Sequence, residues 1–300
     1  MNHQSLYLFC VFVGMSVLLS GCGDVSSPEA KSASNEEVPV ASSVDQNNQA
    51  IDEHDSTSPS EQTTHHYFHK EEKPHAAEWG YEGETGPEHW GELSPEYVLA
   101  KTGQRQSPID ISKSQPTSLP RIKFGYGPSQ IDLVYNGHTV EEFEDHQSSI
   151  EVDGKKFVLQ QFHFHSPSEH TIAGQHFDME MHLVHKSGDG EIAVVGVLIE
   201  EGTDNAAFDQ VWDYLPSAEN RERKERVTVD AATLLPVSHA YYRYTGSFTT
   251  PPCTEDVLWM VLTSPVELSA EQIKTFRAII EGNNRPVQPL NDRTVAVSAD

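Results

Sequence analysis

The stretch Gln161-Phe162-His163-Phe164-His165 decides the fold, because polar and aromatic residues alternate along its whole length. Successive side chains of a β-strand point to opposite faces of the sheet. Both histidines would therefore share one face with Gln161, while Phe162 and Phe164 would enter the opposite layer. The stretch predicts a strand that carries imidazoles on one face and apolar side chains on the other.

A second stretch, Glu180-Met181-His182-Leu183-Val184, repeats this alternation and places Glu180, His182 and Val184 on one face. If the two strands pair, their histidines meet, and Gln161 and Glu180 lie where they can orient the imidazoles by hydrogen bonds. The candidate metal ligands are His163, His165 and His182.

Three neutral imidazoles are typical of a catalytic zinc site, because they leave the fourth tetrahedral position open. Zinc in such a site lowers the pKa of bound water to about 7 and makes hydroxide available at neutral pH. A single His-x-His pair could equally be surface polar residues on a half-exposed strand. The third histidine, in a strand with the same alternation, argues against that interpretation, and we expect one zinc ion per chain.

Two further segments could serve this site. Ser247-Phe248-Thr249-Thr250-Pro251-Pro252 places adjacent hydroxyls beside a stiff proline pair, and a threonine hydroxyl both donates and accepts. Glu169 is the candidate carboxylate to which such a threonine would donate, although Thr-Thr-Pro-Pro is also common as a simple turn. His138 follows the Asn136-Gly137 break and is either an exposed proton relay or a loop histidine without a role.

The remainder predicts one mainly β (α+β) domain over residues 77–300: a large, twisted, mostly antiparallel sheet with a few short peripheral helices. One helix is indicated by a capping box of Ser269 with Gln272 and by Gly282 as its stop. The strands expected from β-branched and aromatic runs between turn signals are Gln130–Tyr135, Ser149–Val152, Lys156–Phe164, Phe177–Val184, Ile192–Ile199, Ala240–Tyr244 and Val257–Leu262.

The first 76 residues have a different composition. Residues 6–19 form an apolar run of signal-peptide length, which ends in Leu19-Ser20-Gly21-Cys22, similar to the lipobox of bacterial lipoproteins. We expect a signal peptide over residues 1–22 with lipidation at Cys22, the alternative being an ordinary cleaved signal. Residues 23–76 are rich in Ser, Glu and other polar residues and predict a disordered acidic linker. Its histidines, from His65 to His75, either bind metal or are simply solvated.

The formal net charge of −26 excludes nucleic acid as a partner, because the chain could not neutralise a phosphate backbone. The three cysteines, Cys10, Cys22 and Cys253, form no Cys-x-x-Cys pair, so a thiolate zinc cage is excluded as well. Histidine is frequent, with 16 residues, which favours an imidazole site.

Seven motifs in order resemble the alpha-class carbonic anhydrases from about Trp79 to the end of the chain. They are WGYEGETGPEHW at 79–90, RQSPIDI at 105–111, NGH at 136–138, QFHFHSPSEHT at 161–171, EMHLVH at 180–185, SFTTPPCTE at 247–255 and NNRPVQPLNDR at 283–293. Together with the signal-like run and the lipobox-like segment, the resemblance indicates an exported bacterial enzyme, lipid-anchored with its catalytic domain in the periplasm or outside the cell. It would act as a monomer or homodimer on carbon dioxide and bicarbonate, and contact the membrane only through its anchor.

The same resemblance implies a role for each matching residue. His163, His165 and His182 would bind zinc, Thr249 and Glu169 would orient the zinc-bound hydroxide, and His138 would be the proton shuttle. Thr250, Val184, Val194, Phe248 and Trp259 would form the substrate pocket. The residues that hold the imidazoles and order the surrounding hydrogen bonds would be Gln161, Glu180, Tyr81, Asn136, Tyr244, His170 and, through its backbone, Asn283.

The chain also departs from the family. Exported members commonly join the segment near residue 100 to the one near Cys253 by a disulfide, whereas residue 100 is alanine here, so we expect Cys253 to be a free thiol. Phe248 stands where leucine is common, and Glu141 adds a negative charge near the cavity rim. Two alternatives are a catalytically silent carbonic anhydrase-like binding module and a cupin, in which Glu169 would itself bind metal.

Overall fold

The computed structural model describes residues 77–144, 148–216 and 222–298. The predicted signal peptide, Cys22 and the predicted linker therefore lie outside the described residues. Within the described residues, no helix is both long enough and apolar enough to cross a membrane.

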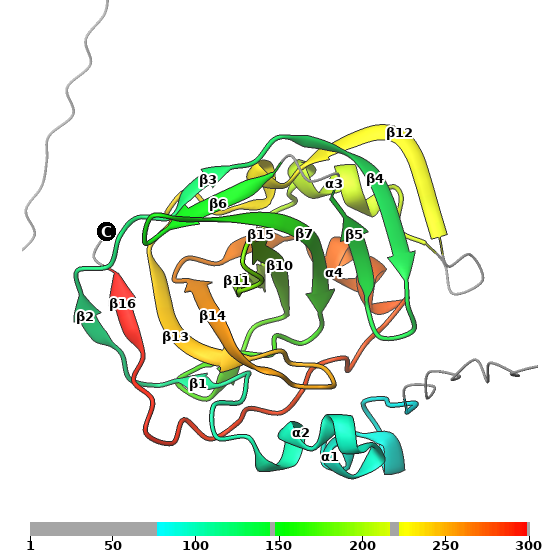
Figure 1. The fold of residues 1–300 in the computed structure, drawn as a ribbon. Coiled ribbons are helices and arrows are strands. Elements are labelled where there is room, and N and C mark those ends of the chain that lie inside the picture. The colour runs from blue at the N-terminus through cyan, green and yellow to red at the C-terminus, as the bar shows by residue number, and fades with distance from the viewer. Residues whose placement is uncertain (1–76, 145–147, 217–221, 299–300) are drawn as a thin grey trace, which may run out of the picture. The chain divides into compact units, whose positions relative to one another are not determined.

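The described chain is dominated by one 13-stranded sheet, with a small 3-stranded sheet beside it. The strands are β1 (Asp110–Ile111), β2 (Gln115–Thr117), β3 (Lys123–Gly125), β4 (Pro128–Tyr135), β5 (Val140–Phe143), β6 (Ser149–Val152), β7 (Lys155–His165), β8 (Thr171–Ile172), β9 (Gln175–His176), β10 (Met179–Ser187), β11 (Ile192–Glu201), β12 (Glu222–Asp230), β13 (Tyr241–Ser247), β14 (Glu255–Leu262), β15 (Val266–Leu268) and β16 (Ala296–Ser298). The helices are η1 (Gly83–Thr85), α1 (Trp90–Leu93), η2 (Pro95–Tyr97), α2 (Leu99–Thr102), α3 (Ala206–Trp212), η3 (Ala231–Leu234) and α4 (Ala270–Arg277). Figure 1 shows the twisted sheet with these short helices at its periphery.

The expected fold class is confirmed. Most neighbouring strands of the large sheet run antiparallel, as in the pairs β7–β10, β10–β11 and β13–β14. The sheet is nevertheless mixed, because β14 and β15 both pair with β11 in parallel. Each of the seven expected strands is present, with boundaries that differ by a few residues at most.

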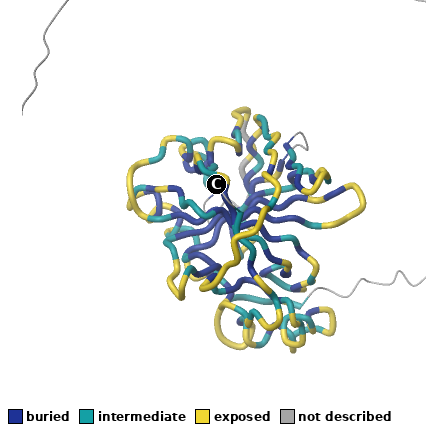
Figure 2. The backbone as a smooth tube through the Cα atoms, turned by 90° about the vertical axis from the view of Figure 1, so that its left-hand side faces the viewer, coloured by how far each residue is buried: buried dark blue, intermediate teal, exposed yellow. Residues whose placement is uncertain are grey.

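The register of β7 against β10 decides the position of the site. His163 lies directly opposite His182, and His165 lies opposite Glu180. Phe162, Phe164, Met181 and Leu183 point away from the histidines and belong to the large buried core. Figure 2 shows that buried backbone gathers in the middle of the domain, while exposed backbone lies mainly in the outer loops. The alternation expected from the sequence therefore separates a polar site from an apolar core.

The expected capping box at the start of α4 is present, with Ser269 accepting from the Gln272 backbone. The expected stop at Gly282 is wrong, because the helix ends at Arg277 with Ala278 as its C-cap. Gly282 adopts φ 73° and donates its N–H to the Ser166 carbonyl at 2.8 Å, which ties the chain to the end of β7. Its left-handed conformation thus serves the approach of the next residue, Asn283, rather than the end of the helix.

Candidate active site

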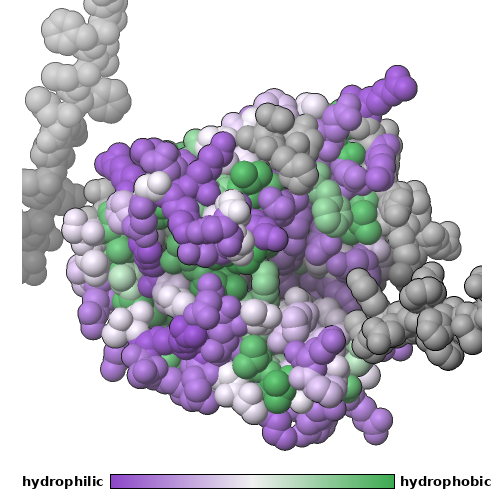
Figure 3. Space-filling view, viewed as in Figure 1, coloured by the Kyte–Doolittle hydropathy of each residue, from purple (hydrophilic) through white to green (hydrophobic). Residues whose placement is uncertain are grey.

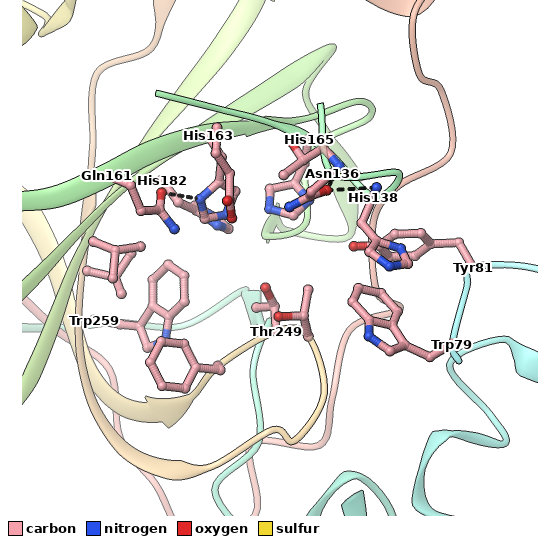
Figure 4. Close-up of a pocket in the computed structure, with 16 residues that line it drawn as sticks. Trp79, Tyr81, Asn136, His138, Gln161, His163, His165, His182, Thr249 and Trp259 are labelled. Carbon is pink, nitrogen blue, oxygen red and sulfur yellow. Dashed lines mark hydrogen bonds between the residues drawn. The ribbon is translucent and has the colours of Figure 1, made fainter. Parts of the chain in front are cut away.

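The candidate ligands come together on the polar face of β7 and β10. One nitrogen from each of His163, His165 and His182 lies within 4.8 Å of the others. Figure 4 shows the three imidazoles converging on one side of the pocket, with Thr249 and Trp259 facing them. Strand pairing alone accounts for this, because His163 and His182 are cross-strand neighbours and His165 is two residues farther along β7.

Each imidazole has one nitrogen held by an oxygen acceptor. The pairs are His163 Nδ1 with Gln161 Oε1 at 2.8 Å, His165 Nδ1 with the Asn283 carbonyl at 2.7 Å, and His182 Nε2 with Glu180 Oε1 at 2.9 Å. In each ring the other nitrogen remains as a potential ligand. His165 Nε2 is buried and has no hydrogen-bond partner among the described residues. Such an orphaned atom fits a metal ion, since a buried acceptor is normally satisfied.

The electrostatics favour neutral imidazoles, which is the form that binds zinc. Burial lowers the pKa of His163 well below its usual value and that of His165 to about 4. Burial also lowers the pKa of His182, although the Glu180 carboxylate opposes this effect. The three side chains therefore keep their lone pairs at neutral pH.

Glu180 is the centre of a buried network behind the histidines. Its Oε1 accepts from His182 and, at 2.7 Å, interacts with His170 Nδ1, while its Oε2 accepts from the backbone N–H groups of Glu169 and His170. Burial would raise the pKa of Glu180, but the neighbouring imidazoles and these hydrogen bonds hold it well below its usual range. His170 Nε2 in turn lies 2.7 Å from the Tyr244 hydroxyl. The fully buried network restrains the orientation of His182.

Glu169 lies beside two of the ligand histidines, His165 and His182. Its Oε1 accepts the backbone N–H of Arg285 at 2.8 Å, and its Oε2 lies 3.6 Å from His165 Nε2. Burial raises the pKa of this carboxyl to about 7, although the neighbouring His182 and, to a smaller extent, the Thr249 hydroxyl lower it. Thr249 and Glu169 are thus adjacent, as the sequence predicts.

Arg285 was not among the predicted site residues. Its side chain is 1% exposed, and its Nη1 donates to Gln106 Oε1 at 2.9 Å and to the Ser107 carbonyl at 2.8 Å. Nη2 donates to the Ala100 carbonyl at 3.1 Å. Arg285 therefore anchors the loop that donates to Glu169. The only signal in the sequence that could have identified Arg285 is its position in the NNRPVQPLNDR motif. No local pattern indicates its hydrogen-bond partners.

The pocket over the histidines brings most of the predicted residues together. Thirteen of them line it, namely Tyr81, Asn136, His138, Gln161, His163, His165, His182, Val184, Val194, Phe248, Thr249, Thr250 and Trp259. The other predicted residues of the domain, Glu169, His170, Glu180, Tyr244 and Asn283, contact the imidazoles or their hydrogen-bond partners in the networks above. Val184, Val194 and Trp259 belong to one buried apolar cluster, with Phe248 packed against it. One wall of the pocket is therefore apolar.

His138 lies in the turn between β4 and β5, away from the metal ligands. Its backbone N–H donates to Asn136 Oδ1 at 2.8 Å, and its ring stacks on Trp79 with 3.6 Å between centroids and 9° between planes. Partial burial lowers the pKa of His138. Trp79 was not predicted as a site residue, and no pattern within its own segment indicates that it meets residue 138 across the fold.

The comparisons with known proteins agree with this geometry. Residues 85–299 match the sequence model of the eukaryotic-type carbonic anhydrase family. A carbonic anhydrase of Klebsiella pneumoniae is 44% identical over 223 residues, which cover 73% of this chain and 91% of that protein. The solved structure of the Thermovibrio ammonificans alpha-carbonic anhydrase with the inhibitor sulfanilamide has a TM-score of 0.72 and 45% identity, covering 74% of this chain and all of that one.

Dioscorin complexed with ascorbate is also similar, with a TM-score of 0.69 and 33% identity over 73% of this chain and 97% of that one. The family match rules out the cupin alternative. It accounts for the order of the seven motifs, for the mixed sheet and for the histidine cluster. The chain belongs to the alpha class of carbonic anhydrases, a zinc-dependent family of lyases that act on carbon dioxide and bicarbonate.

Proposed function

We propose that this chain hydrates carbon dioxide reversibly with one zinc ion held by His163, His165 and His182. The observation that carries the proposal is that the two nitrogens of each imidazole have different partners. One nitrogen is held by an oxygen acceptor, and the other is left as a ligand. When bound, zinc would supply a nucleophile at neutral pH by lowering the pKa of water to about 7.

The protein's own residues would bind and orient the reactants. The apolar wall of Val184, Val194 and Trp259 can accept carbon dioxide, which is neutral and loses little hydration on entering. With its hydroxyl donating to Glu169, Thr249 would accept a hydrogen bond from the nucleophile through its oxygen and so fix the direction of the nucleophile. Thr250 lies in the same lining and would assist at the mouth.

His138 would carry the released proton to solvent. It lines the pocket, is partly exposed, and lies apart from the three buried imidazoles. Partial burial lowers the pKa of His138, which favours the neutral ring that can accept the proton. Stacking on Trp79 gives the ring a defined resting position at the pocket edge.

Stopped-flow hydration of carbon dioxide, with zinc measured on the same sample, tests the proposal. We expect one zinc per chain, and loss of both zinc and activity in His182→Ala. The control His89→Ala removes a surface histidine beside Glu88 and should retain both. Full zinc loading without hydration would instead support the silent binding module, which the intact ligand set does not favour.

We also propose that the protein is exported and lipid-anchored through Cys22, with the domain in the periplasm or outside the cell. The support is the apolar run at 6–19 followed by Leu19-Ser20-Gly21-Cys22. Metabolic labelling with a fatty acid, compared between the natural chain and Cys22→Ser, tests the anchor. Label retained by Cys22→Ser would contradict it. Monomer or homodimer remains the proposed assembly, which light scattering would decide.

A further inference from the structure

Glu141 is a carboxylate inside the catalytic pocket that the proposed chemistry does not use. It lies on β5, directly opposite His163 of β7, and it lines the pocket together with His138 and Asn136. Its strand neighbours Val140 and Glu142 are buried on the other face, so alternation along β5 directs residue 141 toward the pocket. Figure 3 shows a domain surface on which hydrophilic side chains predominate, with apolar side chains exposed among them.

No cation balances this carboxylate within the described part of the chain. None of the residues that line the pocket is a lysine or an arginine, and none of the ion pairs found among the described residues involves Glu141. Burial raises the pKa of Glu141, and a hydrogen bond from Asn136 opposes that shift. The bond has a clear direction, because Asn136 Oδ1 already accepts the backbone N–H groups of His138 and Thr139. The NH2 group of Asn136 is therefore the donor to Glu141.

We propose that Glu141 determines ligand specificity in this pocket by disfavouring anions, the bicarbonate product included, relative to neutral ligands. The inference rests on the proposed function, since it concerns the same pocket. Carbon dioxide carries no charge and is little affected by the carboxylate, whereas bicarbonate is repelled by it. The reaction equilibrium fixes the ratio of kcat/KM in the two directions, so Glu141 changes how strongly anions occupy the pocket rather than the direction of the reaction.

Two sulfonamide probes with the same core and different ring substituents, one neutral and one negatively charged, test this inference on the full-length, zinc-loaded protein. Sulfanilamide, which inhibits a similar enzyme, has a neutral amino group on its ring, and 4-sulfamoylbenzoate has a carboxylate in its place. The readout is the ratio of their dissociation constants, measured by titration calorimetry at pH 8 and low ionic strength. A ratio cancels effects that act equally on both probes, such as altered zinc content.

Glu141→Gln removes the charge and keeps an oxygen that can accept from Asn136. We expect it to improve binding of the carboxylate probe by about five-fold relative to sulfanilamide, as for unit charges roughly 8 Å apart at an effective dielectric constant near 40. Glu141→Ser should shift the ratio in the same direction. Added salt of about 0.5 M should reduce the difference between wild type and Glu141→Gln, because exposed charges are screened.

Glu151→Gln is the matched control, because it removes one negative charge from an exposed ion pair with Lys123 outside the pocket. A ratio that changes equally in Glu141→Gln and Glu151→Gln, or in neither, overturns the inference. In that case tight sulfanilamide binding by the wild type would leave the zinc site itself supported. Failure of both probes to bind zinc-loaded wild type would overturn the inference and the proposed site together.

Discussion

Gly196 on β11 lies directly opposite His182 of β10, where a side chain would meet the Glu180 carboxylate. A Cβ built at residue 196 would lie 3.0 Å from Glu180 Oε1 and 3.4 Å from a methyl group of Val261. The φ of Gly196 is not positive, so glycine is required at this position because it leaves space and not because of its backbone conformation. Gly196→Ala therefore tests whether this space keeps Glu180 against the ligand histidine.

The expected effect depends on how firmly the Glu180 carboxylate is held in place. Its four hydrogen bonds, to His182, His170 and two backbone N–H groups, leave the carboxylate little freedom to move away from a methyl group. Overpacking of this kind destabilises proteins by about 1–3 kcal/mol. Displacing the acceptor of a metal-binding histidine lowers metal affinity by about 10–100-fold. We expect Gly196→Ala to lower stability and zinc affinity by amounts at the lower end of these ranges, because a shift of the Glu180 carboxylate by a few tenths of an ångström would relieve the contact.

Zinc affinity measured by chelator competition, together with the melting temperature of the zinc-free protein, separates the two effects. Gly127→Ala is the control, since a Cβ there meets nothing within 4 Å and its φ is also not positive. It should leave zinc affinity unchanged and stabilise slightly, by at most about 1 kcal/mol. Zinc affinity of Gly196→Ala within two-fold of the wild-type value would refute the reasoning, whatever happens to its melting temperature.

Three other outcomes are expected. His138→Ala should slow hydration by about 100-fold at low buffer concentration, and added imidazole should restore it, as stopped-flow measurements would show; a rate insensitive to imidazole would contradict the shuttle role. With Cys10 and Cys22 replaced by serine, the buried Cys253 thiol should react with iodoacetamide only on unfolding, because burial raises its pKa to about 11, and rapid labelling of the native protein would contradict this. The contribution of this thiol to stability should be lost as pH rises from about 8.5 toward that value, because the unfolded chain releases the proton first. Arg285→Met should lower the free energy of unfolding by about 3 kcal/mol or more in urea titrations, since it leaves two carbonyls and an amide oxygen without their donors, and a change below about 1 kcal/mol would show that water replaces them.

Local alternation made much of the site predictable. The period of two in residues 161–165 and 180–184 placed the imidazoles on one face of each strand, and the structure has that arrangement. The capping box at Ser269 was equally local and is present. The helix end was misjudged, because Gly282 adopts its left-handed conformation for a contact with Ser166 that lies far away in the sequence.

The roles that followed from the family resemblance depend on contacts that no local pattern contains. The sequence alone could show that His165 lies on the polar face of its strand, but its partner is a backbone carbonyl of residue 283, 118 positions away. Trp79 beneath His138 and Arg285 behind Glu169 are likewise long-range contacts. Periodicity along one strand determines which way a side chain points, because that follows from backbone geometry. Only the tertiary structure decides what the side chain meets, because strand register and loop closure bring together residues whose separation in the chain carries no signal.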